Sequence, residues 1–268
     1  MSTTTKLGYP NLVNHVNATS PRTMVALSHE PGIPSKIVAA KPVALTTSES
    51  VDDYLKAILE LGGSEELRVT TKALAERLRV RTPSVTGMLQ RLASERPALV
   101  VYQKHRGVRL TAAGKRRAGE LVRHHRLLEL FLHDVLKYSW DEVHEEAERL
   151  EHFISERFED RVAAILGDPE IDPHGHIIPQ KYGAGIYRDE VPLARWPLQT
   201  PATISSVSDR SPAALRELEQ LGLVPGTVLT VERSNSASSL SVRLAAGADP
   251  IRVSLDLADC ISVIARAA

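Results

Sequence analysis

The sequence predicts a mainly α-helical chain with a small β-rich domain at its C-terminal end. Apolar residues recur with helical spacing through much of 48–166, interrupted by one short stretch with the pattern of a β-hairpin. After residue 200, short runs alternate apolar and polar residues, as half-buried strands do. The 268 residues are 43% apolar and 25% charged, which is enough to build folded domains.

The first folded part, 48–110, has the order helix, turn, helix, hairpin. Its hairpin pairs 99–102 with 108–110 around a polar tip that ends in Gly107. This order is typical of a winged helix-turn-helix domain. The expected helices run from Ser48 to Gly62, from Thr70 or Thr71 to about Leu78, and from Thr82 with Pro83 at its first position.

The remaining chain divides at its prolines. Thr111 can cap a long helix that reaches about Leu136, and Ser139 with Glu142 predicts a capping box that opens another helix to about Leu166. Five prolines in 167–199 indicate a linker rather than a core element. Residues 200–268 predict a small β-barrel interrupted by one helix over 212–221, and 1–47 a mostly disordered extension.

The net charge of zero conceals two blocks of opposite sign. Between Arg68 and Arg126 there are 15 basic and 3 acidic residues, whereas between Asp141 and Asp160 there are 2 basic and 9 acidic residues. Two solvated faces would explain this pattern, but a basic block beside an acidic, histidine-bearing one favours nucleic acid and metal cations as partners.

The basic block carries the predicted DNA contacts. In a winged helix the second helix of the motif enters the major groove N-terminus first, and the wing contacts the phosphate backbone. A helix-turn-helix that serves only for packing is the alternative. The candidate DNA-binding residues are Arg81, Thr82, Pro83, Ser84 and Thr86 on the helix, with Lys104, His105 and Arg106 on the wing.

The acidic block carries the predicted metal ligands. On a helix from Ser139, the side chains of His144, Glu148, Glu151 and His152 would share one face, and His125 and Glu129 lie four residues apart on the preceding helix. Paired His–Glu hydrogen bonds along solvated faces would be the simpler interpretation. Residues 148–152 are similar to an inverted zinc-protease motif, but glutamate stands where that motif needs histidine, so a metal-dependent hydrolase is only an alternative.

Composition excludes other classes. No run approaches the roughly 18 consecutive apolar residues of a membrane helix, and the N-terminus lacks the apolar centre of a signal peptide, so we expect a cytoplasmic protein. The single cysteine, Cys260, excludes an internal disulfide framework and a cysteine-based zinc cluster.

This order of parts resembles the diphtheria toxin repressor family of metal-dependent transcriptional regulators over residues 50–268. The most specific stretches are 123–129 and 143–152, joined by Asp172-Pro173-His174-Gly175 and Ile178-Pro179. The resemblance implies a homodimer that binds a double-stranded DNA operator, with a winged helix domain (48–110), a dimerisation and metal domain (111–166), a linker (167–199) and an SH3-like domain (200–268). It implies a repressor of metal uptake and not an enzyme.

The resemblance also implies two metal sites. One would use Asp53, Glu148, Glu151 and His152, and the other His125, Glu129 and His144 with Asp209 from the SH3-like domain. Iron-type members have Met and Cys where this chain has Asp53 and Glu148, and ligands without sulfur suit Mn²⁺, so manganese is predicted and iron is the alternative. Lys56 replaces an acidic residue of short manganese regulators, which favours two separate mononuclear sites.

Overall fold

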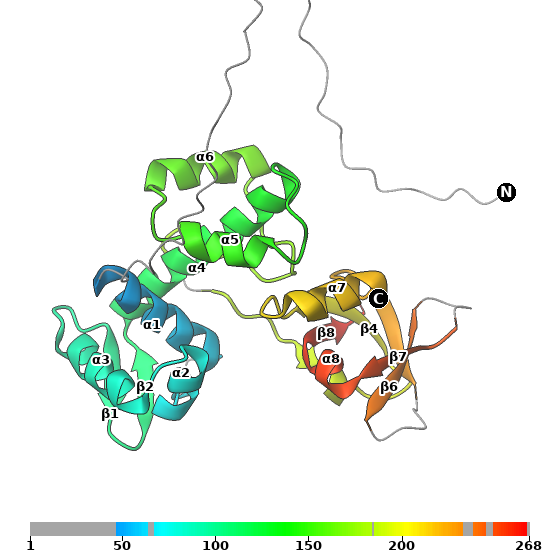
Figure 1. Ribbon diagram of the computed structural model, residues 1–268, viewed down its shortest axis with the longest axis horizontal. Coiled ribbons are helices and arrows are strands. Elements are labelled where there is room, and N and C mark those ends of the chain that lie inside the picture. The colour runs from blue at the N-terminus through cyan, green and yellow to red at the C-terminus, as the bar shows by residue number, and fades with distance from the viewer. Residues whose placement is uncertain (1–46, 64–66, 184, 233–237, 245–248, 267–268) are drawn as a thin grey trace, which may run out of the picture. The chain divides into compact units, whose positions relative to one another are not determined.

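The computed structural model describes residues 47–63, 67–183, 185–232, 238–244 and 249–266, so nearly all of the predicted extension over 1–47 lies outside the described residues. Figure 1 shows the elements. In chain order they are α1 (Thr47–Gly62), α2 (Thr71–Arg77), α3 (Thr82–Ser94), β1 (Val100–Gln103), β2 (Gly107–Leu110), α4 (Ala112–Asp134), α5 (Val143–Leu150), α6 (Glu156–Leu166), β3 (Val191–Pro192), a 3-10 turn η1 (Leu193–Arg195), β4 (Pro201–Val207), α7 (Pro212–Gln220), β5 (Val228–Glu232), β6 (Ser239–Leu244), β7 (Ile251–Ser254), α8 (Leu255–Asp259) and β8 (Ile261–Ala265).

The elements α1 to β2 form the predicted winged helix. The Thr70 side chain caps α2 by accepting from the Ala73 amide, which stabilises the start of that helix. Strands β1 and β2 pair antiparallel, and Val69 adds an isolated bridge to Val108. Gly107 has φ +90°, and a Cβ there would lie 2.5 Å from the Val69 carbonyl oxygen, so the wing requires glycine at this position.

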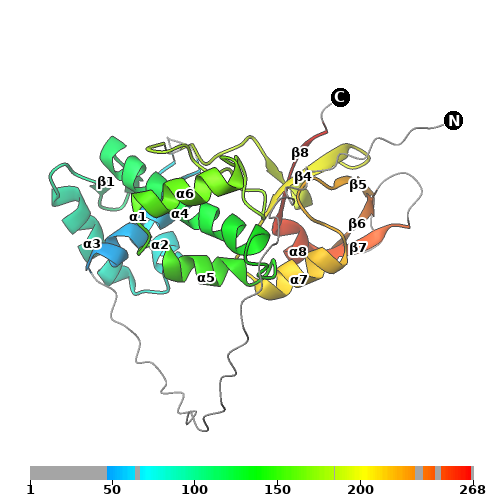
Figure 2. The ribbon, with the colours of Figure 1, turned by 90° about the horizontal axis from the view of Figure 1, so that it is seen from above.

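Helix α4 begins at the predicted cap, with the Thr111 hydroxyl accepting from the Gly114 amide. It packs against α1 on one side and against α5 and α6 further along, as Figures 1 and 2 show. Its buried positions include the ionisable residues His125, Arg126 and Glu129 among apolar side chains. This helix therefore carries ionisable groups into the interior beside both neighbouring helical layers.

The predicted continuous helix from Ser139 to about Leu166 is wrong in one respect, because the chain forms two helices there. The Ser139 amide donates to the Glu142 carboxylate, which is one half of the predicted capping box. However, α5 begins only at Val143 and ends at Leu150, and a turn over 151–153 follows. The Ser155 side chain then caps α6 by accepting from the Phe158 amide. Local capping thus competes with helix continuation. Glu151 is the C-cap residue of α5 and still donates its amide to the Ala147 carbonyl, so the helical geometry that begins before His144 ends at Glu151.

The C-terminal part is an SH3-like antiparallel sheet domain, as predicted. Its strand order is β3-β8-β4-β5-β6-β7, and α7 and α8 contribute to its core. Alternate residues of the strands are buried, for example Leu229 and Val231 on β5. The expected strands and the helix near 212–221 all occur.

The segment 167–199 differs from the prediction of a linker that adds nothing to the core. Ile178 is 2% exposed and packs with α4 and α6, and Leu193 is fully buried in the β domain. Gly175 has φ +88°, and a Cβ there would lie 2.1 Å from the Ser205 carbonyl oxygen, so this segment lies directly against β4. Prolines restrict the backbone here without keeping it at the surface.

Among the residues that the structure describes, none of the helices combines the length and the apolar character that a membrane span needs.

Candidate metal centre and nucleic-acid interface

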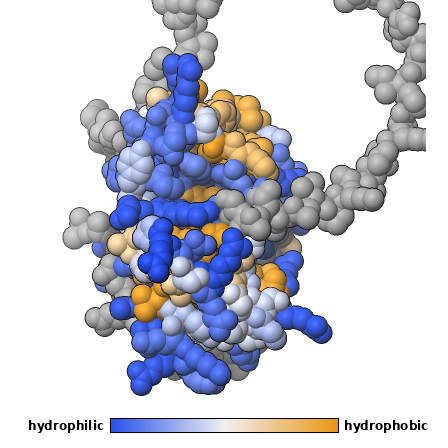
Figure 3. Space-filling model, turned by 90° about the vertical axis from the view of Figure 1, so that its left-hand side faces the viewer, coloured by the Kyte–Doolittle hydropathy of each residue, from blue (hydrophilic) through white to orange (hydrophobic). Residues whose placement is uncertain are grey.

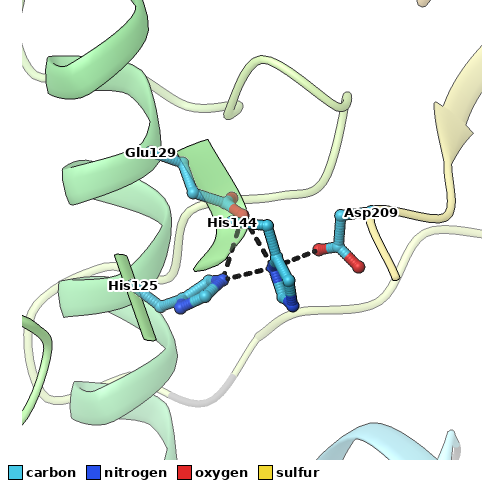
Figure 4. A group of neighbouring side chains, drawn as sticks. All are labelled: His125, Glu129, His144 and Asp209. Carbon is cyan, nitrogen blue, oxygen red and sulfur yellow. Dashed lines mark hydrogen bonds and ion pairs between the residues drawn. The ribbon is translucent and has the colours of Figure 1, made fainter. Parts of the chain in front are cut away.

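Four side chains converge from two helices and one loop, and we call them the His125 cluster (Figure 4). His125 and Glu129 lie on α4, His144 lies on α5, and Asp209 lies just before α7. Glu129 Oε1 lies 3.0 Å from both His125 Nε2 and His144 Nδ1, and these two nitrogens are 3.0 Å apart. Asp209 Oδ2 lies 3.4 Å from His144 Nδ1. The predicted group, including the ligand from the β domain, therefore lies together.

The electrostatics of the His125 cluster are dominated by its buried carboxylates. Burial alone would lower the pKa of His125, but the charges of Glu129 and Glu151 outweigh it and raise the pKa to about 9. Burial likewise opposes the charged form of His144, whereas its hydrogen bonds to Glu129 and Glu148 raise its pKa to about 10. Without metal, both imidazoles are therefore positively charged at neutral pH, because the neighbouring carboxylates favour the protonated form.

The donor set fits a divalent cation. Carboxylate oxygens and imidazole nitrogens bind such ions at about 2.0–2.2 Å, so ligand atoms on one ion lie about 3–4 Å apart. The ligand atoms of the His125 cluster all lie within 4.8 Å of one another. When bound, a cation would supply the charge that the histidine protons supply otherwise, and its binding would release those protons.

A second group, the Asp53 cluster, joins α1 to the end of α5. It contains Asp53, Glu151 and His152. His152 Nε2 lies 3.0 Å from Asp53 Oδ1 and 3.7 Å from Glu151 Oε1. The hydrogen bond that His152 donates to Asp53 raises the pKa of His152, with burial opposing it. Residues separated by about a hundred positions thus meet, one in the winged helix and two in the helical domain.

Glu148 takes a different place from the one predicted. Its Oε1 lies 3.5 Å from His144 Nε2, one helical turn away, rather than with the Asp53 cluster. The hydrogen bond to His144 lowers the pKa of Glu148 to about 2. Both clusters nevertheless face one cavity of about 780 Å³, which Asp53, His144, Glu148 and Asp209 help to line.

Sequence reasoning missed a third group around Glu129. Its Oε2 lies 3.7 Å from His174 Nδ1, and both atoms are buried without a hydrogen-bond partner in the described part of the chain. Asp172 positions the loop by accepting from the His174 and His176 amides. Two unpartnered buried ligand atoms facing each other also fit a cation. The alternation of Asp172, His174 and His176 in a proline-flanked segment is the signal that could have revealed this group.

The candidate DNA-binding residues lie on the surface of the winged helix. Arg81 is the N-cap residue of α3 and is exposed. Thr82, Pro83 and Ser84 are exposed as well, and Thr86 is half-buried. The wing residues Lys104, His105 and Arg106 form the exposed turn between β1 and β2. His105 has φ +66°, a left-handed conformation that tightens this turn. Both predicted sets are therefore accessible to a ligand.

Three matches to models of protein families define the class of this protein. Residues 46–108 match the family model of the N-terminal DNA binding domain of iron dependent repressors. Residues 111–180 match the model of the metal binding and dimerisation domain of the same repressors, and residues 191–265 match the FeoA domain. The fold and the clustered carboxylates and imidazoles agree with these matches. The protein is a metal-dependent transcriptional repressor.

Individual relatives then define the family. The iron-dependent repressor IdeR of Mycobacterium leprae is 32% identical over 209 residues, which is 72% of this chain and 88% of the relative. A solved manganese-dependent transcriptional repressor in complex with manganese is 36% identical, with a TM-score of 0.72 over 81% of this chain and all of that one. A crystal structure of ScaR with bound Zn²⁺ is 30% identical, with a TM-score of 0.68 over 81% of this chain and 99% of that one. This chain belongs to the diphtheria toxin repressor family, and the predicted resemblance is confirmed.

Proposed function

We propose that this protein is a manganese-responsive, homodimeric repressor of metal-uptake genes, in which the metal centre sets the orientation of the winged helix. The observation that carries the proposal is the Asp53 cluster. Asp53 belongs to α1 of the winged helix, whereas Glu151 and His152 belong to the helical domain. A cation held by all three would fix the angle between the two domains.

The proposed mechanism is a linkage between two equilibria. A metal that binds the DNA-competent arrangement better than other arrangements increases its population by the ratio of the two affinities. Asp53 and His152 orient the first helix of the winged helix, and Asp209 ties the β domain to His144. In a dimer this would set the distance between two recognition helices, which must match about one turn of DNA or a multiple of it.

Manganese is favoured by the ligand chemistry. Both clusters offer carboxylate oxygens and imidazole nitrogens, and the single cysteine, Cys260, lies after α8 in the β domain. Oxygen and nitrogen ligands suit Mn²⁺, whereas thiolates favour softer or later metals. The manganese-dependent relative described above supports the same choice, and the iron-named relatives make Fe²⁺ the alternative.

For DNA, we propose that the first turn of α3 reads bases and that the wing holds the phosphate backbone. Arg81 could donate to a guanine or a phosphate, and Thr82, Ser84 and Thr86 could donate or accept at either. Pro83 lies in the first turn of α3, where its fixed φ suits a helix start. Lys104, His105 and Arg106 would add positive charge along the backbone.

For the dimer, we propose an interface around α6. Phe153 is 72% exposed, Ile165 on α6 is 65% exposed, and Phe158 is 42% exposed. Figure 3 shows apolar side chains at the surface in the upper part of its view, at the level of α6 in Figure 1. Large apolar groups exposed close together are typical of protein interfaces, and the matched family model names a dimerisation domain here.

The proposal is tested by operator binding under anaerobic conditions, titrated separately with Mn²⁺, Fe²⁺ and Zn²⁺. Asp53→Asn should abolish the metal dependence while the protein stays folded, because a ligand charge is lost and little core is. Asp52→Asn is the matched control, since Asp52 pairs with Arg117 at 2.5 Å instead. Metal-dependent binding by Asp53→Asn at wild-type metal concentrations would contradict the bridging site. Activation by Fe²⁺ alone would contradict the manganese assignment.

A further inference from the structure

An ammonium group lies inside the metal centre. Lys56 Nζ donates to both carboxylate oxygens of Glu151, at 2.9 and 2.8 Å, and lies 3.1 Å from His125 Nδ1. Lys56 is 6% exposed and Glu151 is 2% exposed, so bulk water does not screen this pair. Both oxygens of Glu151 thus face one positive centre, as they could face a metal ion, and His125 lies beside it.

Glu151 belongs to both clusters through its two oxygens. Its Oε1 faces the Asp53 cluster, 3.7 Å from His152 Nε2, and its Oε2 lies 2.5 Å from His125 Nδ1. A carboxylate in this position could bridge two cations. Lys56 occupies both oxygens from the α1 side, one turn along that helix from Asp53. Any cation that uses Glu151 must therefore share it with Lys56.

We propose that Lys56 is a covalently attached cation that competes with divalent metal for Glu151, and so sets the metal concentration at which the protein responds. The inference rests on the proposed function, because it concerns the same centre. A second positive charge a few ångströms from a metal site with little solvent opposes binding of the ion. The pKa of Lys56 supports a permanent charge: burial alone would lower it, but Glu151 and Glu60 raise it above its ordinary value.

The sign of one measurement separates this role from a structural one. If Lys56 merely held Glu151 in place for the metal, its loss would weaken metal binding. If it competes, its loss removes one of the two cationic groups that hold Glu151, the other being His125, and Mn²⁺ binds more tightly. The metal-free Lys56 variant would then be less stable than the metal-free wild type, and Mn²⁺ would restore the melting temperature of the variant.

The test is Mn²⁺ binding to the full chain, followed by calorimetry and by the electron paramagnetic resonance signal of free Mn²⁺. Lys56→Met removes the charge at similar volume, and Lys56→Gln is the second variant in case the first does not fold. Lys72→Met is the matched control, because the Lys72 side chain on α2 is 84% exposed and its Nζ is no closer than 3.8 Å to Glu76 Oε1, its partner in an exposed ion pair. In both Lys56 variants we expect the dissociation constant for Mn²⁺ to fall by about tenfold or more, which corresponds to about 1.4 kcal/mol or more. In Lys72→Met we expect no change.

An equal or higher dissociation constant in the Lys56 variants would overturn the competition. The wild type separates this result from a failure of the proposed function. If wild-type protein binds Mn²⁺ but never responds to it at an operator, the proposed function fails and the comparison of affinities still decides the role of Lys56. If only the variants bind Mn²⁺, the competition is supported, and if neither binds, it is wrong.

Discussion

Replacing Glu129 by alanine should remove the residue on which the His125 cluster depends. Glu129 is fully buried, and its Oε1 lies 3.0 Å from a nitrogen of each of two histidines. With pKa values of about 9 and about 10, His125 and His144 are protonated at pH 7 without metal, so both hydrogen bonds are between charged groups. The variant loses both bonds at once.

The size of the effect follows from these contacts. Hydrogen bonds to charged groups contribute about 1.5–3 kcal/mol each, and breaking a buried ion pair costs about 3–5 kcal/mol. We therefore expect Glu129→Ala to lower the free energy of unfolding by about 3–5 kcal/mol in chelator. At about 2–4 °C per kcal/mol for a chain of this size, the melting temperature should fall by roughly 6–20 °C.

The assay is thermal unfolding in chelator and then in saturating Mn²⁺. Wild-type protein should gain stability from the ion, by about 2.7 kcal/mol at a hundred times the dissociation constant. The variant should lose the part of this gain that comes from the His125 cluster. Glu145→Ala is the control, because Glu145 is 71% exposed and such surface pairs contribute about 0–1 kcal/mol. A variant that melts with the wild type in chelator and gains equally from Mn²⁺ would refute the assignment.

Three further predictions concern DNA, protons and the dimer. Lys104→Ala and Arg106→Ala should weaken operator binding on all sequences and flatten its dependence on salt, because fewer counterions are released; a changed base preference would instead place the wing among the bases. The protonated His125 and His144 must release a proton to the solvent before they can bind a metal. The affinity for Mn²⁺ should therefore rise with pH below about 9, by about tenfold per pH unit for each proton released. A Mn²⁺ affinity that calorimetry finds unchanged between pH 6.5 and 8.5 would argue against both residues as ligands. Phe153→Asp should shift the protein toward monomers in sedimentation experiments, and an unchanged dimer would place the interface elsewhere.

Much of the fold could be predicted because local signals and packing agree. Thr70 and Thr111 cap the helices that they were predicted to cap, and Gly107 lies where the hairpin needs a positive φ. The break between α5 and α6 could not be predicted in the same way. Its sequence has helical periodicity on both sides, and only the Ser155 cap separates the two helices. A capping signal inside a periodic run is weak evidence when read alone.

The site was predictable where ligands share a helix and less so where they come from distant segments. The spacing of His125 and Glu129 placed both in one cluster, whereas Glu148 contacts His144 one turn away on α5 and is not part of the Asp53 cluster. His174 was missed as a member of the centre, and the contact of Lys56 with Glu151 was not predicted, because both depend on packing between residues far apart in the sequence. Spacing within an element constrains neighbours on that element, and tertiary packing decides the rest.

The dipeptide Asp209-Arg210 limits how freely the β domain could be exchanged between relatives. Asp209 reaches His144, while the Arg210 guanidinium lies 3.5 Å from Glu60 on α1. Because consecutive Cα atoms are fixed about 3.8 Å apart, the two contacts cannot be adjusted independently. A chimera that takes this domain from another protein would have to keep an acid followed by a base, in this order and at this loop length. Insertions between β4 and α7 should therefore be poorly tolerated.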